Sequence, residues 1–409
     1  MKTRATFSAV CILFFLFLNS CTKSDPEELG ASYSRVRLYD DTLPDPRNHS
    51  IRIAAGNGRL LMTYGNFFER FFMVNGAAIE PPPPKNAWML TDNEGNLIKR
   101  GTFPSGLAMG DILAMPDNSF LIVTSIGDFS SQGSYGGVQL MRLDPNGVLS
   151  SVDTLDLPVS DPVMILATVH LSLSQNGNAL LYFGYSSQGG FGGSFIGEMT
   201  VQGDFLWHKE FMDYTITDCV SDPNGGYLIT GKIFYLMTYT STVFIMNTNA
   251  TADSLWFREI VCVDAGNGLD NGIGQIVSSG DGNYRLSYAD WAANYSRQNT
   301  EVVTFNQEGE FLDTTVVALG ASVAIQKDSK GLFLLYGIDA VYGSVTDQFN
   351  SSYAILDAEM NLTTKSQFQN LTTDMMNAAC RTSDGKIACF GIIQSYGKRY
   401  YIPQLILFN

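Results

Sequence analysis

A short turn-forming motif recurs along the chain and limits the folds that are open to it. Its clearest copy is SDPNGGYLITG (221–231), in which residues that favour tight turns precede β-branched and aromatic residues typical of strands. The copies are centred at spacings of 48 to 60 residues on Gly58, Asn118, Gly177, Gly225, Gly282, Gly331 and Gly385. Seven copies of one hairpin at this period indicate a repeat architecture.

A second turn alternates with the first in six of the seven periods. Its copies include LTDNEGNLIKR (90–100), RLDPNGVLSSV (142–152) and TFNQEGEFLDTT (304–315), each joining two further short strands. A period therefore holds four strands and two tight turns, which is one blade of a propeller. We predict an all-β fold over residues 34–409, a seven-bladed β-propeller of four-stranded antiparallel blades. The pattern resembles the Asp-Gly-Gly-Tyr-punctuated propellers of Bacteroidota envelope proteins, which implies a fold and leaves the function open.

The last period is one strand short. After Gly385 the sequence reaches YIPQLILFN (401–409), whereas the unassigned strand-like segment YSRVRLYD (33–40) precedes the first repeat. We expect this N-terminal strand to pair with the last blade and close the ring, because closure removes the exposed sheet edges that invite aggregation.

The N-terminal segment has the order of a secretory signal. Lys2 and Arg4 precede an apolar run over 9–18, which is short for a membrane span. The following LNSC (18–21) resembles the lipobox of bacterial lipoproteins. That resemblance implies that residues 1–20 are removed and that Cys21 carries acyl chains such as palmitate. The alternative is a plain signal peptide with an incidental cysteine.

The residues after Cys21 indicate where in the cell the protein is located. TKSDPEE (22–28) resembles the acidic export signal of Bacteroidota-type lipoproteins, which implies the outer membrane with the protein facing the cell exterior. An ordinary solvated linker is the alternative. Residues 21–33 are predicted to be a lipidated tether outside the fold.

Charge excludes one class of partner. Residues 1–20 contain two basic and no acidic residues, so 23 basic and 40 acidic residues remain after their removal, a net charge of −17. Nucleic acid is therefore not an expected partner, and attraction to anionic headgroups is not expected either. No second apolar stretch approaches the roughly 20 residues of a membrane helix, so the lipid is the expected attachment.

The cysteines allow disulfides but not a zinc site. Besides Cys21, the mature chain contains Cys219, Cys262, Cys380 and Cys389, and the envelope permits disulfides. Without a Cys-x-x-Cys pair and with three histidines, no metal site is expected. If Asp384-Gly385 is a two-residue turn, Cys380 lies opposite Cys389 at a disulfide-compatible distance. The alternative is two reduced cysteines that pack as small apolar residues.

A ring of polar residues is predicted on the innermost strands. About seven residues before each inner turn stand Ser50, Asp111, His170, Asp218, Gln275, Ser322 and Asn377. Such a ring could hold water, a polar ligand or a cation, although any wet channel mouth needs polar residues. Asp111, His170 and Asp218 have the composition of an acid–base set. No cofactor is expected, and a structural cation in the channel is left open.

The loops between second and third strands are rich in aromatic residues. The first, NFFERFFMVNGAAIEPPPPK (66–85), contains Phe67, Phe68, Phe71 and Phe72 and a stiff polyproline run. Corresponding loops carry Tyr135, Phe191, Tyr235, Trp291, Tyr295, Tyr342 and Tyr396. Aromatic side chains in surface loops can stack on sugars or anchor protein partners, or they can pack between blades.

Three short motifs resemble O-glycosylation acceptors of this bacterial group. Thr154, Ser254 and Thr314 each follow an aspartate, in segments predicted to be the exposed outermost strand of a blade.

Two functions follow as hypotheses. The first is a non-enzymatic surface lipoprotein, a binding or scaffold module for a glycan, a peptide or an outer-membrane protein complex. The alternative is a polysaccharide lyase or hydrolase that uses Asp111, His170 and Asp218 at the channel mouth. The sequence contains no P-loop, Gly-x-Ser-x-Gly or His-Glu-x-x-His motif. An enzyme should show converging carboxylates with perturbed pKa values in a deep pocket.

Overall fold

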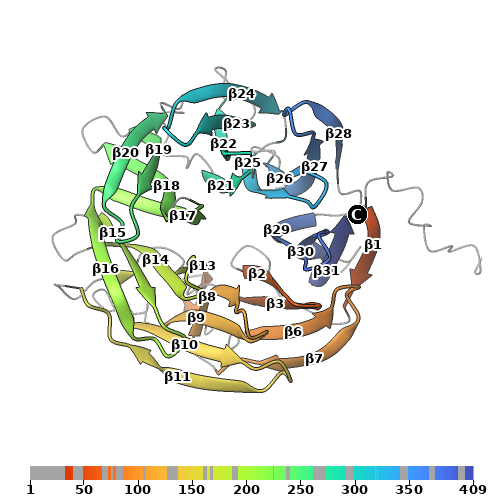
Figure 1. Cartoon of the computed structure of the whole chain (residues 1–409). Helices are drawn as coiled ribbons and strands as arrows, with labels where there is room; N and C mark the ends of the chain where they lie inside the picture. The colour runs from red at the N-terminus through yellow and green to blue at the C-terminus, as the bar shows by residue number, and fades with distance from the viewer. Residues whose placement is uncertain are drawn as a thin grey trace, which may run out of the picture.

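The computed structural model shows an all-β ring of seven four-stranded antiparallel blades (Figure 1). The structure describes residues 33–39, 49–66, 72–74, 77–79, 86–104, 107–126, 137–159, 164–165, 169–186, 192–223, 225–235, 240–260, 273–279, 281–291, 298–317, 319, 321–340, 349–367, 374–394 and 401–408. This confirms the predicted seven-bladed propeller.

The blades follow one another along the chain, each with its first strand at the centre of the ring (Figure 1). Blade 1 contains β2 (His49–Gly56), β3 (Arg59–Asn66), β6 (Ala87–Asp92) and β7 (Leu97–Thr102), with a small hairpin of β4 (Phe72–Val74) and β5 (Ala77–Ile79) between β3 and β6. Blade 2 contains β8 (Leu107–Ala114), β9 (Phe120–Ile126), β10 (Gly137–Leu143) and β11 (Leu149–Leu155). Blade 3 contains β13 (His170–Leu173), β14 (Ala179–Ser186), β15 (Gly192–Met199) and β16 (Phe205–Met212), and the short β12 (Met164–Ile165) also pairs with β14.

The second half of the ring repeats this plan. Blade 4 contains β17 (Tyr214–Asp222), β18 (Gly226–Tyr235), β19 (Thr240–Thr248) and β20 (Ser254–Ile260). Blade 5 contains β21 (Ile273–Ser278), β22 (Asn283–Trp291), β23 (Gln298–Asn306) and β24 (Phe311–Val317). Blade 6 contains β25 (Ala321–Lys327), β26 (Phe333–Ala340), β27 (Phe349–Leu356) and β28 (Leu362–Gln367). Blade 7 contains β29 (Asp374–Arg381), β30 (Ile387–Gln394), β31 (Tyr401–Phe408) and β1 (Tyr33–Leu38).

The N-terminal strand closes the ring as predicted. Strand β1 pairs antiparallel with β31, with Tyr33 opposite Phe408 and Leu38 opposite Gln404. Beyond it, the Tyr39 hydroxyl donates to the carbonyl of Gly95 in the β6–β7 turn of blade 1, at 3.0 Å. The first and last parts of the described chain are therefore joined both within blade 7 and across its border with blade 1.

All seven predicted inner turns have the same backbone geometry. Each of the seven residues on which the repeat is centred has a positive φ, from 66° at Asn118 to 100° at Gly225. The third-to-fourth-strand turns have the same feature at four glycines and at Ala252 and Met360. Glycine adopts this left-handed region without steric cost, which explains the spacing of glycines along the sequence.

The predicted pairing of Cys380 with Cys389 is wrong. The Thr382 N–H donates to the Lys386 carbonyl and the Gly385 N–H to the Thr382 carbonyl, so three residues separate the paired positions rather than two. Such loops combine a type I turn with a left-handed residue. The added residue shifts the register by one, and Cys380 faces Ala388 while Cys389 faces Ala379. Both cysteines, like Cys219, are free thiols, and Cys262 lies outside the described residues.

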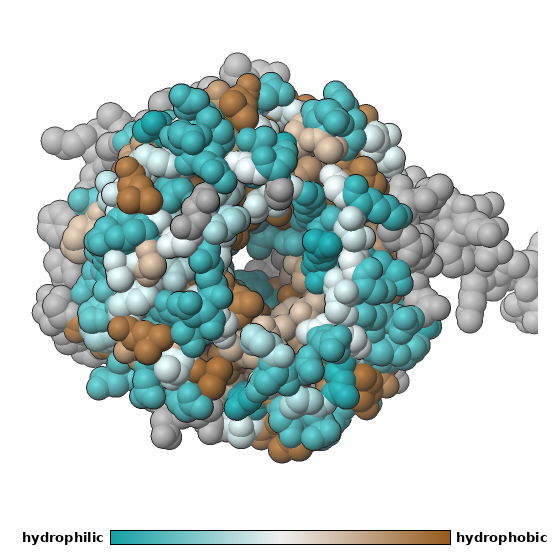
Figure 2. All heavy atoms as spheres, in the orientation of Figure 1, coloured by the Kyte–Doolittle hydropathy of each residue, from teal (hydrophilic) through white to brown (hydrophobic). Residues whose placement is uncertain are grey.

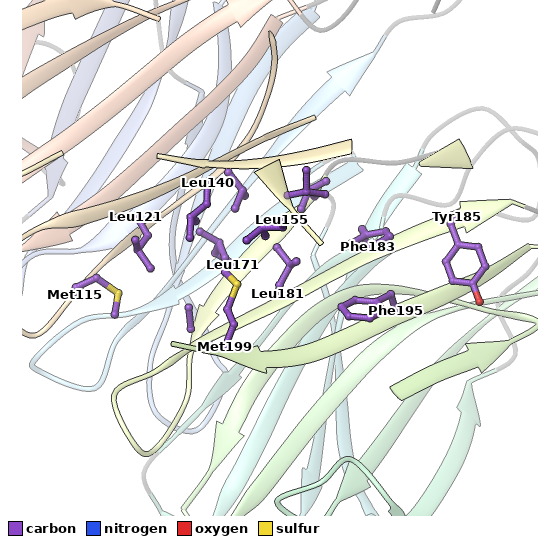
Figure 3. Packing of buried hydrophobic residues seen from close by; sticks show 14 residues of the cluster. Met115, Leu121, Leu140, Leu155, Leu171, Leu181, Phe183, Tyr185, Phe195 and Met199 are labelled. Atoms are coloured by element: carbon purple, nitrogen blue, oxygen red, sulfur yellow. The ribbon is translucent and has the colours of Figure 1, made fainter. Parts of the chain in front are cut away.

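The hydrophobic core lies between the blades. Its described residues form seven clusters, one at each border between neighbouring blades. Figure 3 shows the cluster between blades 2 and 3, which includes Leu121 and Leu140 of blade 2 and Leu181 and Phe195 of blade 3. Cys380 packs against the cluster on the blade 1 side of blade 7 and Cys389 lies in the cluster on the blade 6 side. Opposite faces of one sheet therefore hold the two thiols.

Burial falls from the middle of each blade outward. Strand β6 is almost entirely buried, whereas the outer strands β7 and β24 are almost entirely exposed. Two neighbouring blades cover the middle strands, which therefore read as continuous apolar runs. In the part of the chain that the structure describes, no helix is long and apolar enough to cross a membrane.

Candidate functional site

The first strands of the seven blades surround a central channel. Figure 2 shows its opening at the centre of the visible face, bordered by both polar and apolar residues. All seven residues of the predicted polar ring lie on these strands, one per blade. The structure describes the side chains of Asp111, His170, Asp218 and Gln275; those of Ser50, Ser322 and Asn377 lie outside the described residues.

Five of the seven polar positions lie at or beside irregularities in strand pairing. The register shifts between Met109 and Ile112 in β8, between Ile216 and Asp218 in β17, and between Ile273 and Ile276 in β21. Similar shifts occur beside Ser322 in β25 and Asn377 in β29. A bulge leaves backbone groups without a partner in the ladder, so a short polar side chain at the bulge can satisfy them.

Asp111 connects blades 1, 2 and 3. Its Oδ1 accepts from the N–H of Ile112 at 2.9 Å, and its Oδ2 accepts from the N–H of Leu171 in blade 3 at 3.1 Å. Arg52 Nε lies 3.5 Å from Oδ1, and His170 Nδ1 lies 3.7 Å from Oδ2. Burial alone would raise the pKa of Asp111, but His170, Arg52 and the Leu171 N–H together lower it below its usual 3.8.

Asp218 of blade 4 makes a similar connection two blades further round the ring, between blades 3, 4 and 5. Its Oδ1 accepts from the N–H of Cys219 at 2.9 Å and from the Tyr182 hydroxyl of blade 3 at 3.2 Å. Its Oδ2 accepts from the N–H of Ile276 in blade 5 at 2.8 Å. Burial outweighs these hydrogen bonds here and raises the pKa of Asp218 above its usual 3.8.

The structure brings the three residues of the predicted acid–base set to one side of the channel. His170 stacks on Tyr182 with ring centroids 5.2 Å apart, and Tyr182 in turn contacts Asp218. Each carboxylate nevertheless accepts two backbone N–H groups, one from its own bulge and one from another blade. A carboxylate so engaged holds backbone in place and has little freedom to move a proton to or from a substrate. These contacts match a structural role.

The remaining channel residue described, Gln275, also connects blades. Its Oε1 accepts from Gln326 Nε2 of blade 6 at 3.1 Å. Among the described residues, no group of three or more histidine, cysteine, aspartate or glutamate side chains has the arrangement of a metal site.

The predicted binding aromatics fall mostly outside the described residues. The aromatic residues outside the described part of the chain are Phe67, Phe68, Phe71, Tyr135, Phe191, Tyr295, Tyr342 and Tyr396. The lipidation candidate Cys21 also lies outside it. Phe72 lies in β4, Tyr235 ends β18 and Trp291 ends β22, without described side chains. The loops in question leave the blades at the ends opposite the two turns, because second strands run away from the inner turns.

The three glycosylation candidates lie where they were expected. Thr154 in β11, Ser254 in β20 and Thr314 in β24 are exposed residues on the outermost strands of blades 2, 4 and 5. An acceptor hydroxyl must be accessible, so the positions are compatible with modification, and glycosylation itself stays a prediction.

Two buried acidic residues were missed by the sequence reasoning. Glu198 of blade 3, 3% exposed, accepts from the Tyr227 hydroxyl of blade 4 at 3.1 Å, and Asp222 of blade 4 accepts from the Tyr284 hydroxyl of blade 5 at 2.7 Å. Both tyrosines stand two residues after the left-handed glycine of the repeat, at Gly225 and Gly282. That recurring Tyr was a visible signal of a blade-to-blade hydrogen bond.

A groove of about 480 Å³ lies at the turns between blades 4 and 5. It is lined by Asp222, Gly225, Gly226, Asn247, Thr248, Asn249, Leu255, Trp256, Gln307 and Glu308. Asn247 Nδ2 donates to Asp222 at 2.7 Å, and Trp256 Nε1 donates to the carbonyl of Gln307 at 2.8 Å. The first bond lies within blade 4 and the second crosses the border to blade 5, and both match a structural role.

Comparisons with known proteins assign the chain to no family. No protein-family model matches the chain, and no curated protein matches it either. Similar solved structures include the Dos1 propeller, 10% identical over 90% of this chain and 94% of that one, with a TM-score of 0.47. A protein of unknown function from Bacteroides caccae is 11% identical over 69% of this chain and 89% of its own, with a TM-score of 0.40. The GH43_1 enzyme from Xanthomonas citri, solved with xylotriose, is 14% identical over 65% of this chain and 92% of its own, with a TM-score of 0.40. At such identities and TM-scores these likenesses carry no conclusion about activity.

Proposed function

We propose that this propeller is a lipid-anchored protein of a bacterial outer membrane that acts as a non-enzymatic binding or scaffold module. One observation carries the non-enzymatic part. The channel carboxylates of Asp111 and Asp218 accept backbone N–H groups from their own bulges and from other blades, so they hold the ring together. The ring then presents its loops to a glycan, a peptide or an outer-membrane protein complex.

The lipid anchor rests on the sequence around Cys21. The LNSC segment supports acylation of this cysteine, and the acidic residues that follow support export to the cell exterior. The Cys21→Ala variant should leave the membrane fraction and become soluble or stay unprocessed. Continued fractionation with the outer membrane would contradict the anchor.

Export is tested separately. Replacement of Asp25, Glu27 and Glu28 by alanine leaves Cys21 in place and removes the acidic signal. We expect the variant to stay membrane-bound and to become protected from protease added to intact cells. If added protease digests the variant as readily as the native chain, the export signal is contradicted, and the proposal of a lipid anchor at Cys21 is unaffected.

The binding surface is assigned to the loop over residues 66–85. Four phenylalanines in a proline-stiffened loop supply large apolar contacts at low entropic cost. Cross-linking and affinity purification of the lipidated protein from its native membrane should capture a partner. Replacement of Phe67, Phe68, Phe71 and Phe72 by serine, which keeps the loop length, should abolish that capture while the Tm stays unchanged. Equal capture by a folded variant would exclude this loop.

The alternative is a polysaccharide lyase or hydrolase, and one observation favours it. The pKa of Asp111 is lowered and the pKa of Asp218 is raised by their surroundings. Enzymes that need one general acid and one general base separate the pKa values of two carboxyl groups in the same way. Incubation with a panel of polysaccharides, with reducing ends and unsaturated products as readouts, tests it. Product that disappears in Asp218→Asn would replace the scaffold proposal with the enzyme.

A further inference from the structure

Exposed apolar side chains recur at one position of the blades. They stand directly before, or on the first two residues of, the outermost strand, in blades 1 to 6. We call this set the turn rim: Leu97, Ile98, Val148, Leu206, Leu255, Phe311, Leu312 and Leu362. Each has between 45% and 66% of its surface exposed. Single exposed apolar residues are common on proteins, but recurrence at one position in six blades is a pattern of the whole ring.

The strand register shows where blade 7 fits this pattern. In blades 1 to 6 the first residue of the outermost strand pairs with the last or the next-to-last residue of the third strand, as Leu362 pairs with Leu356 and Leu97 with Thr91. In blade 7 the corresponding pair is Phe408 with Tyr33. Tyr33 thus occupies in blade 7 the place that the turn rim occupies elsewhere, and the segment from Cys21 joins the ring there.

The length of this segment limits the distance from the lipid. Eleven residues lie between Cys21 and Tyr33, and this segment reaches at most about 40 Å when fully extended. The segment enters β1 at the turn end of blade 7, so the acyl chains lie within about 40 Å of the side of the ring that carries the turn rim. A protein that is already tethered needs only weak contacts to take one orientation, because the tether keeps their local concentration high.

We propose that the turn rim rests on the surface of the phospholipid bilayer that holds the acyl chains. This inference rests on the proposed lipid anchor and adds an orientation to it. Leu and Phe side chains insert into the boundary between headgroups and acyl chains. The opposite ends of the blades, from which the second-to-third-strand loops leave, then point away from the membrane.

Charge specifies the kind of lipid surface. The turns that carry the rim are acidic, with exposed Glu94, Asp204, Asp253, Glu308 and Glu359 near it. Anionic headgroups would repel these carboxylates, so the contact fits a zwitterionic surface such as phosphatidylcholine. Added anionic lipid should weaken the contact at low salt.

Single-cysteine reporters on the lipidated protein test the proposal on phosphatidylcholine vesicles. A polarity-sensitive fluorophore is attached to Leu255→Cys and Leu362→Cys on the turn rim. Met212→Cys and Val316→Cys are the matched controls, since they are equally exposed and stand at the far ends of outermost strands, about 20 Å away. The native chain labelled in parallel measures the background from its own cysteines. We expect emission to rise about twofold on vesicles at the rim sites and to stay unchanged at the controls.

A second variant separates the rim from the anchor. Leu255→Gln, Leu312→Gln and Leu362→Gln together should leave flotation with vesicles intact, because the acyl chains remain, and should remove the rise of a probe at Leu206→Cys. Since all of these side chains are exposed, the Tm should not change.

The outcomes are distinct. A rise at the rim sites alone supports the proposal. Flotation with equal signals at all four sites, or with a rise at Met212 and Val316, overturns the orientation and leaves the anchor standing. Failure of the lipidated protein to float overturns the anchor and the orientation with it. If emission at the rim sites rises only after native membrane proteins are added to the vesicles, the rim contacts a protein partner, and the lipid contact is overturned.

Discussion

At the scale of single residues, Asp111 shows how a polar channel residue stabilises the ring. Its carboxylate accepts N–H groups from blades 2 and 3 and lies beside Arg52 of blade 1. In Asp111→Asn an amide N–H would face these donors. We expect the free energy of unfolding to fall by about 1–3 kcal/mol at pH 7, measured by urea denaturation. The exposed Asp204→Asn is the control and should change little.

The pH dependence of this effect has a definite sign. The pKa of Asp111 is lower in the folded protein than its usual 3.8, so its stabilising effect is complete above pH 3.8 and is lost as the pH falls through the folded value. The difference in stability between the native chain and Asp111→Asn should therefore shrink in acid. A difference that stays constant down to the lowest pH of folding would contradict an ionised Asp111.

Asp218 should behave in the opposite way. Burial raises its pKa above 3.8, so the folded chain binds a proton at this site more tightly than the unfolded chain does. The native chain should gain stability relative to Asp218→Asn as the pH falls from neutral through the folded pKa. Urea denaturation of both chains between pH 7 and pH 4 measures this. Parallel pH profiles for Asp111→Asn and Asp218→Asn would show that the two sites are alike.

The sequence predicted the strands on which these residues lie, but it could not predict their hydrogen-bond partners. Their position in the repeat predicted a polar ring on the inner strands, and all seven residues lie there. The bulges at Asp111 and Asp218, and the N–H groups of Leu171 and Ile276 that meet them, depend on how neighbouring blades sit against each other. Such contacts join residues about 60 positions apart and leave no local pattern.

At the scale of elements, the inner turns determine both the register and the border between blades. Gly385 and Gly331 share a left-handed backbone, with φ of 85° and 88°. A Cβ at Gly385 would lie 2.5 Å from the Ser329 side chain of blade 6, whereas nothing lies within 4 Å at Gly331. Gly331→Ala should therefore cost about 1–2 kcal/mol from backbone strain alone. Gly385→Ala should cost about 1–3 kcal/mol more because of overpacking, seen as a larger fall in Tm. Equal effects would show that the turn of blade 7 does not pack on blade 6.

The same turns show where sequence reasoning about elements fails. The glycine spacing predicted every inner turn, because each centre of the repeat has a positive φ. The predicted turn between Thr382 and Lys386 has two residues, whereas the structure has three. The sequence Ser-Asp-Gly suits both a two-residue turn and a type I turn followed by a left-handed residue, so it could not distinguish them. A one-residue error moves every partner, which is why Cys380 was matched with Cys389.

At the scale of the whole molecule, the ring depends on one strand from the N-terminal side. The count of turns predicted seven blades and the missing strand of the last one, because both follow from the order of elements along the chain. Two kinds of blade-to-blade contact were not predicted, although the recurring Tyr of the repeat was a signal of the second. Seven apolar clusters fill the borders, and hydrogen bonds such as Tyr227 to Glu198 and Tyr284 to Asp222 cross them.

The closing strand gives the last prediction. Deletion of residues 33–39 removes β1 and leaves the edge of β31 without its ladder partner, from Gln404 to Phe408. It also removes Tyr39, 8% exposed, and the Arg37 Nη2 bond to Asn96 Oδ1 of blade 1 at 2.8 Å. Because a free edge pairs with other chains, the unlipidated deletion variant should self-associate and unfold at lower urea concentration than the unlipidated parent. Size-exclusion chromatography with light scattering measures the first effect.

A matched variant separates the strand from its side chains. Arg37→Ala with Tyr39→Phe keeps the β1–β31 ladder and removes the side-chain hydrogen bonds to the β6–β7 turn. This variant should stay monomeric and lose about 1–2 kcal/mol of stability. A synthetic peptide of residues 31–40 should restore the monomer when added to the deletion variant, since it supplies the missing ladder. A deletion variant that is monomeric and as stable as its parent would show that β1 does not hold the ring closed.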